Sequence, residues 1–307
     1  MRGGREVTPQ AEAISLLEEL GINQLPIIPT EICQRLDIHY CEDHLKDLDG
    51  FLVLNQKVGK GVICVSSLIA EQGRKNFTVA HELGHWCMDS FEQNAFYCSR
   101  DDIESFKLTT KPIELRANEF AAEFLMPQFI YKPLVDARSP GWGQIKDLAA
   151  LSQTTLTATA IRFMDLTDEA CCLIVSQAGR IAWFRKSRDF RPYVQMDNRL
   201  LSSGTVAYAI FQGNTTPECF EGVKADNWVS GRGVKPYTEI LEWSLPVNSY
   251  GQILTLLYDE EGIAGWDEDD DVDEGVEIEW EPPTFHKGKR KREKDETCFL
   301  RQFNGKG

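Results

Sequence analysis

The sequence has few histidines, no long apolar run and no export signal. Only five of its 307 residues are histidine. It contains no apolar stretch of about 18 residues, so no membrane-spanning helix is expected. The first residues, 1–7, lack the apolar core that a signal peptide requires. We therefore expect a cytoplasmic protein without a membrane anchor.

The chain also lacks a surplus of basic charge and a regular cysteine framework. Its 33 Lys and Arg residues stand against 48 Asp and Glu residues, giving a net charge of −15. Direct binding of nucleic acid is disfavoured, because the phosphate backbone requires a basic surface. The nine cysteines are odd in number and irregularly spaced, which indicates reduced thiols rather than a disulfide scaffold. Cys87, near the motif described next, is expected to be a packed side chain rather than an oxidant sensor.

Two of the five histidines lie four residues apart, in the sequence Phe-Thr-Val-Ala-His-Glu-Leu-Gly-His of residues 77–85. Residues four apart share one face of a helix, so His81 and His85 can direct imidazole nitrogens at one metal ion. Glu82 lies one step round the helix, in the position of a metalloprotease general base. Gly84 is costly inside a helix, which predicts that another element passes close to it.

A second helical pattern follows from Ile113 to Met126 and stops at Pro127. It reads Glu-x-x-x-Asn near its start and Phe-Ala-Ala-x-Phe-Leu-Met-Pro at its end. Together the two motifs closely resemble the ImmA/IrrE family of zinc metallopeptidases over roughly residues 25–127. By position, the resemblance implies that His81, His85 and Glu114 are the zinc ligands. It implies that Glu82 is the catalytic base and that Asn118 orients a histidine ligand.

Other residues near these motifs are assigned more ordinary roles. Glu119 and Glu123 are displaced from Glu114 by helical angle, and we expect them on a solvated face. A tyrosine could stabilise the oxyanion of a tetrahedral intermediate, and Tyr97 and Tyr131 are the candidates. For both we favour surface exposure or packing as the default interpretation.

We expect an α+β chain of three parts. Residues 1–137 form a zincin-like peptidase domain, in which the HExxH helix and the second ligand helix border a small sheet. Residues 138–169 form a helical connector that resembles a helix-turn-helix. Residues 170–307 form an α+β regulatory domain that resembles the sensor-like region of some family members. We expect a small-molecule or protein signal to act there.

Hydrophobic periodicity and turn residues predict the elements of the first part. We expect a helix capped by Thr8, a short helix within 26–37, strands at 38–40, 50–55 and 61–65, and a loop from 90 to 111.

The remaining patterns are read in the same way. Residues 139–143 are predicted to be a linker, and 145–166 either a DNA-binding helix-turn-helix or a helical pair packed on the peptidase. We favour the packed pair, because Arg162 is the only basic residue of its second helix. Later patterns predict a hairpin at 171–184, a helix at 206–211, strands around 228, 237–243 and 251–258, and solvated acidic and basic blocks at 267–274 and 287–294.

The resemblance implies a zinc-dependent endopeptidase that cuts one specific protein, a helix-turn-helix transcriptional repressor, and thereby derepresses stress-response or mobile-element genes. The alternative is a non-catalytic zinc-containing regulatory protein that binds a repressor or a small signal. A third class, a DNA-binding regulator using residues 145–166 and 287–294, is disfavoured by the charge of −15.

Overall fold

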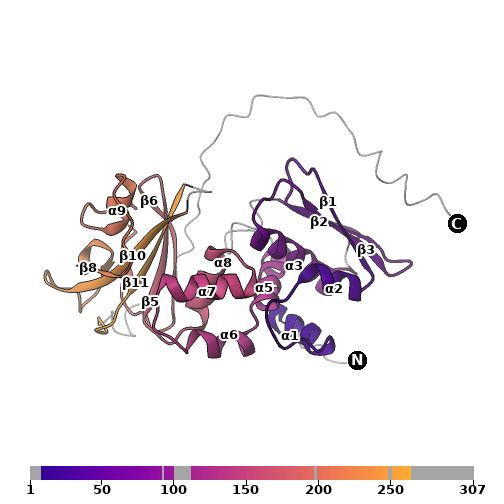
Figure 1. Cartoon of the computed structure of the whole chain (residues 1–307), viewed down its shortest axis with the longest axis horizontal. Coiled ribbons are helices and arrows are strands. Elements are labelled where there is room, and N and C mark those ends of the chain that lie inside the picture. The colour runs from indigo at the N-terminus through magenta and orange to yellow at the C-terminus, as the bar shows by residue number, and fades with distance from the viewer. Residues whose placement is uncertain (1–7, 92, 100–111, 197–198, 248–250, 264–307) are drawn as a thin grey trace.

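The structure is a computed structural model that describes residues 8–91, 93–99, 112–196, 199–247 and 251–263. The acidic and basic blocks predicted at 267–274 and 287–294 lie outside the described residues. Figure 1 shows an N-terminal sheet with its helices at one end, a C-terminal sheet at the other, and the helices α6, α7 and α8 near the middle.

The N-terminal sheet has four strands in the order β1-β3-β2-β4. The central pair is antiparallel and consists of β2 (Gly50–Asn55) and β3 (Lys60–Ser66). The strand β1 (Ile38–Asp43) pairs parallel with β3, and β4 (Ala95–Cys98) pairs antiparallel with β2. The predicted loop from 90 to 111 is therefore wrong at β4, which is a four-residue strand at the edge of the sheet.

Four helices accompany this sheet: α2 (Pro29–Arg35) and α3 (Gln72–Met88) contact its strands, and α1 (Pro9–Glu19) and α5 (Pro112–Leu125) pack against α3. The predicted cap of α1 is confirmed, since the Thr8 hydroxyl accepts a hydrogen bond from Ala11 N at 3.2 Å. The predicted close approach at Gly84 is also confirmed. A Cβ atom there would lie 3.2 Å from the Phe120 ring and 3.3 Å from Ala117 Cα of α5, so α3 and α5 cross at this glycine.

The connector contains α6 (Gln128–Val135), α7 (Trp142–Ser152) and α8 (Leu156–Leu166). The linker predicted at 139–143 is wrong in its second half, because Trp142 begins α7 and is fully buried. Its indole nitrogen donates a hydrogen bond to Trp243 O at 2.6 Å. Most of α8 is buried, including Arg162, so the helical pair is packed against the rest of the chain, as favoured from the sequence.

The C-terminal sheet is antiparallel, with five strands in the order β6-β5-β11-β10-β8. Its predicted hairpin is confirmed, and the turn residues Ala178 and Gly179 have φ values of 51° and 75°, as a tight hairpin requires. Trp228, predicted to lie in a strand, instead follows a short 3₁₀ helix. The elements are β5 (Cys171–Gln177), β6 (Arg180–Lys186), β7 (Tyr193–Val194), α9 (Val206–Phe211), β8 (Glu221–Lys224), η1 (Ala225–Asn227), β9 (Val229–Ser230), β10 (Glu239–Val247) and β11 (Gln252–Tyr258).

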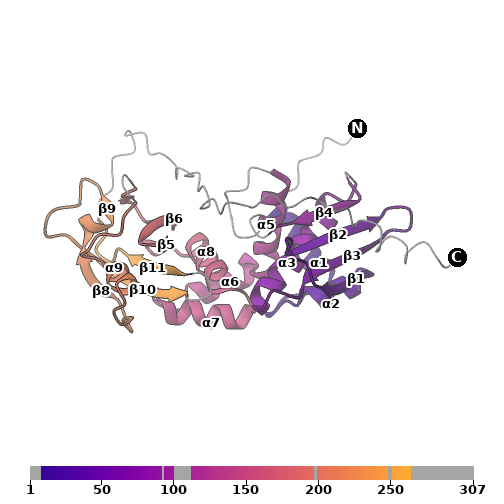
Figure 2. The same cartoon turned by 90° about the horizontal axis from the view of Figure 1, so that it is seen from above.

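One hydrophobic core runs from the N-terminal helices through the connector into the C-terminal sheet. It includes Leu17 of α1, Phe163 of α8 and Leu256 of β11. A second core lies within the C-terminal part, around Trp228 and Ala207. Figure 2 shows α6, α7 and α8 between the two sheets. No helix in the described part of the chain is long and apolar enough to span a membrane.

Candidate metal centre

The helix α3 places both motif histidines in the interior. His81 is fully buried and His85 is 1% exposed. Across the crossing at Gly84, α5 presents Glu114, which is 6% exposed. A helix with two buried imidazoles therefore faces a helix that supplies one buried carboxylate.

Three side-chain atoms of these residues converge on one point. The His81 and His85 Nε2 atoms are 3.2 Å apart. Glu114 Oε2 lies 3.1 Å from His81 Nε2 and 3.4 Å from His85 Nε2. Ligand atoms held tetrahedrally at 2.0–2.1 Å from zinc are separated by about 3.3–3.4 Å. The donor set and its spacing therefore fit a zinc ion.

The other nitrogen of each imidazole is held by a hydrogen bond. His81 Nδ1 lies 2.9 Å from Asn118 Oδ1, and His85 Nδ1 lies 2.9 Å from Asp89 Oδ2. Because an amide oxygen and a carboxylate oxygen only accept, each Nδ1 donates, which leaves Nε2 available as a ligand. Asn118 thus has the position expected of an orienting residue, and Asp89 is a second one.

Burial and hydrogen bonding shift the pKa values of these groups in different directions. Burial lowers the pKa of His81, because the charged imidazole loses its hydration. Burial acts the same way on His85, but hydrogen bonds to Asp89 and Glu114 outweigh it and raise the pKa to about 9. Burial opposes ionisation of Glu114, yet hydrogen bonds from both imidazoles hold its pKa well below the usual range. Glu114 is therefore anionic at neutral pH, as a metal ligand would be.

Glu82 lies on the same helix and is fully buried beside β2. A Cβ atom on Gly50 would lie 3.4 Å from Glu82 Oε1 and 2.6 Å from the Thr78 methyl group. Glycine at position 50 therefore lets the strand approach the carboxylate closely.

Residues 33–164 match the IrrE N-terminal-like domain, a peptidase family. This chain carries an IrrE N-terminal-like domain. The family recognised from the two sequence motifs, that of the ImmA/IrrE metallopeptidases, is confirmed. The match begins in α2 and ends in α8, so it includes all the metal-centre residues described above.

A solved structure, titled "Mycobacterium tuberculosis transcriptional regulator", shares the fold of much of the chain. The TM-score is 0.51 at 14% sequence identity, with 82% of this chain and 75% of that chain covered. At this identity the likeness concerns the fold. No curated protein matches the chain.

Sequence reasoning missed three residues around the centre of the IrrE-like domain. Asp89 could have been identified from the sequence, since it follows His85 by one helical turn. Phe96 and Cys98 could not, because β4 was not predicted. The Phe96 ring stacks on His85 with centroids 4.5 Å apart and an interplanar angle of 12°. Cys98 is buried at the end of the same strand.

The structure also tests the positions expected for two glutamates and a tyrosine of the IrrE-like domain. The solvated position expected for Glu123 is wrong, because this residue is 2% exposed and ion-paired with Arg162. Glu119 is half-buried and accepts a hydrogen bond from Gln10. Tyr131 is buried and bonds Leu148 O and Ser152, so its packing role is confirmed.

Tyr97 and Cys87 also have the ordinary structural roles expected for them. Tyr97 is 58% exposed and contacts the Phe51 ring, in keeping with a surface tyrosine. Cys87 packs against the core, and burial raises its pKa to about 12. The carboxylates of Glu12 and Glu19 in α1 contribute to this rise in pKa.

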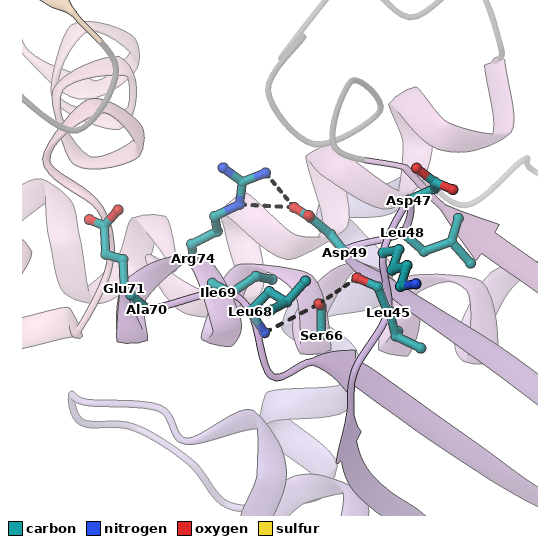
Figure 3. Close-up of a pocket in the computed structure, with 11 residues that line it drawn as sticks. Leu45, Asp47, Leu48, Asp49, Ser66, Leu68, Ile69, Ala70, Glu71 and Arg74 are labelled. Atoms are coloured by element: carbon teal, nitrogen blue, oxygen red, sulfur yellow. Dashed lines mark hydrogen bonds and ion pairs between the residues drawn. The ribbon is translucent and has the colours of Figure 1, made fainter. Parts of the chain in front are cut away.

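A pocket of about 470 Å³ lies beside the first turns of α3. Figure 3 shows Arg74 and Asp49 paired at its wall, with Leu68 and Ile69 nearby. Arg74 Nε donates to Asp49 Oδ2 at 2.8 Å, and both residues are buried. Asp49 precedes Gly50, and Arg74 lies two helical turns, about 12 Å, before Glu82. The pocket therefore lies next to the start of β2, about two helical turns along α3 from Glu82.

Proposed function

We propose that this protein is a zinc-dependent endopeptidase of gluzincin type that cuts one specific protein. The observation that carries the proposal is the buried triangle of His81, His85 and Glu114, with Glu82 on the same helix. A zinc ion held there would act as a Lewis acid toward a peptide carbonyl and lower the pKa of a water molecule to about 7.

The protein's own residues supply the remaining steps. The Glu82 carboxylate accepts a proton from the attacking water and delivers it to the leaving amine. Asn118 and Asp89 keep the two imidazoles in one tautomer and one orientation. The stacked Phe96 ring covers His85 and excludes water from that side.

The arrangement of the sheet favours an extended peptide as the substrate. Among the described strands, β4 lies at the edge of the N-terminal sheet, and its residues Phe96 and Cys98 face the centre. A peptide that pairs with β4 would run past the metal ligands, and main-chain hydrogen bonds would hold it. The pocket next to Arg74 would then accept a side chain of that peptide.

We propose a helix-turn-helix transcriptional repressor as the substrate class. The family resemblance supports this choice, and the net charge of −15 suits a basic DNA-reading domain. Cleavage would release the genes that the repressor controls. A small molecule or a protein bound to the C-terminal part would provide the signal.

The test is incubation of the purified chain with repressors encoded by neighbouring genes, with and without a chelator. We expect the wild-type protein to cut one bond in one of them and the chelator to stop the reaction. Glu82→Gln should keep one equivalent of zinc and lose activity by about 10²–10⁴-fold. Unchanged cleavage by Glu82→Gln would refute the assigned base. Zinc binding without cleavage by any form would favour the non-catalytic regulatory protein.

A further inference from the structure

The edge strand β4 brings a cysteine into the metal centre. Cys98 pairs with Gly50 in the sheet register, and Cys98 O accepts a hydrogen bond from Asp49 N at 3.0 Å. The side chain is 1% exposed. Phe96, two residues earlier and therefore on the same face of the strand, stacks on His85. The strand thus directs two successive inward side chains at the ligand helix.

The Cys98 sulfur belongs to a group of potential ligands. The Sγ atom and one ligating atom each from His81 and Glu82 lie within 4.8 Å of one another. All three residues are buried. Because His81 also belongs to the metal triangle, Cys98 and Glu82 adjoin that triangle at the His81 corner.

This placement distinguishes Cys98 from the other thiols. Within the part of the chain that the structure describes, it is the only cysteine in a group of three or more potential ligands. Cys87 is closer to His85 in sequence but belongs to no such group. Thiolate is among the ligands that zinc prefers, with a bond of about 2.3 Å.

We propose that Cys98 is an inhibitory fourth ligand of the zinc ion, which exchanges with the catalytic water and so holds a fraction of the peptidase in a latent form. This inference rests on the metal centre of the proposed function. In the structure the Cys98 thiol is directed at Ser99 O, at 3.7 Å. A change to another staggered χ1 rotamer moves the sulfur without moving the strand.

The step balances in atoms and charge. The S–H bond of Cys98 breaks, the sulfur replaces the water in the fourth position of the zinc ion, and the proton leaves with the released water. The latent form then has four protein ligands, as closed zinc sites do, and no bound water for Glu82 to activate. A thiol-directed electrophile such as an alkyl halide would reverse this state. It forms an S–C bond, halide leaves, and the sulfur no longer binds the metal.

The test uses the full chain loaded with cobalt(II) in place of zinc. Visible d–d bands report an occupied centre, and a near-ultraviolet sulfur-to-cobalt band reports a thiolate ligand. We expect both in the wild-type protein. Cys98→Ser and Cys98→Ala should keep the visible bands and lose the sulfur band. The matched control, Cys87→Ser, should keep both.

Each of the other possible results would contradict either Cys98 as a ligand or the metal centre itself. Visible bands without a sulfur band in the wild-type protein, or a sulfur band that persists in Cys98→Ser, would exclude Cys98 as a ligand and leave the metal centre intact. Absence of all bands in the wild-type protein would overturn the metal centre itself, and this inference with it. As a second measurement, zinc affinity should fall at least about tenfold in Cys98→Ser relative to Cys87→Ser; equal affinities would count against a fourth ligand.

Discussion

Asp89 Oδ2 accepts a hydrogen bond from His85 Nδ1 at 2.9 Å, one helical turn further along α3. Asp89 is the C-terminal cap of the helix and is fully buried. Its other oxygen, Oδ1, lies 3.5 Å from the Arg116 guanidinium of α5. The carboxylate therefore links the end of the ligand helix to the helix that supplies Glu114, and it fixes the tautomer of His85.

Removal of this carboxylate should weaken metal binding. We expect Asp89→Ala to lower zinc affinity by about 10–100-fold, because His85 loses the acceptor that orients its ring. Asp89→Asn keeps an acceptor oxygen and should lose less. Titration against a competing chelator measures both.

Asp136→Ala is the matched control for Asp89→Ala. Asp136 also caps a helix, and it pairs with Lys132 at the surface. Its substitution should leave zinc affinity unchanged. Equal affinity in Asp89→Ala and the wild-type protein would show that the hydrogen bond does not support the ligand.

The sequence allowed His81 and His85 to be placed together from their local spacing, and Glu114 and Asn118 to be placed beside them from the resemblance of the second motif to a known family. The i, i+4 spacing of His81 and His85 dictates a shared helical face, and the second motif places Glu114 and Asn118 one turn apart. The elements missed depend on contacts between distant segments. Four residues, Ala95–Cys98, carry too little periodicity to indicate a strand, and β4 forms only because β2 is there to pair with it.

The error at Glu123 has the same origin. The helical angle correctly places Glu123 on a different face of α5 from Glu114. It does not show which element packs against that face. This face meets α8, where Arg162 donates both to Glu123 and to Met126 O. Arg162 is the only basic residue of α8, and this signal was interpreted only as too little charge for DNA.

The Glu123–Arg162 pair provides a stability prediction. Glu123→Ala would leave the guanidinium buried without its carboxylate, which should cost about 3–5 kcal/mol of unfolding free energy. The double substitution Glu123→Met with Arg162→Met should recover most of that loss. Urea unfolding measures the free energy of unfolding of the wild-type protein and of the single and double variants. The exposed pair Arg138–Asp147 is the control, and Arg138→Ala should cost under about 1 kcal/mol.

Zinc should stabilise the folded chain through the same three ligands. A ligand that binds only the native state at 100 times its dissociation constant adds about 2.7 kcal/mol. We expect the melting temperature to rise on addition of zinc and to fall on chelation, as followed by calorimetry. Glu114→Ala should remove most of this shift, whereas substitution of the half-buried Glu119 by alanine should preserve it. A shift of the same size in Glu114→Ala would place the stabilising metal elsewhere.

The first turns of α3 are in contact with the turn between α7 and α8, and a glycine makes the contact possible. A Cβ atom on Gly73 would lie 2.5 Å from Thr154 C and 2.6 Å from Thr155 N. Asn76 Nδ2 donates to Gln153 O in the same turn, at 3.0 Å. We expect Gly73→Ala to destabilise the chain by about 1–3 kcal/mol, because backbone must move to admit the methyl group.

Gly143→Ala tests whether this cost comes from the contact or from the loss of a helical glycine. Gly143 lies in the first turn of α7, and a Cβ atom there would meet nothing within 4 Å. Alanine at that position should be neutral or stabilising by up to about 1 kcal/mol. Urea midpoints that move in opposite directions for the two variants would confirm the contact. Equal midpoints would show that the turn yields freely, and α3 would then have no rigid connection through it to the helices that carry the C-terminal sheet.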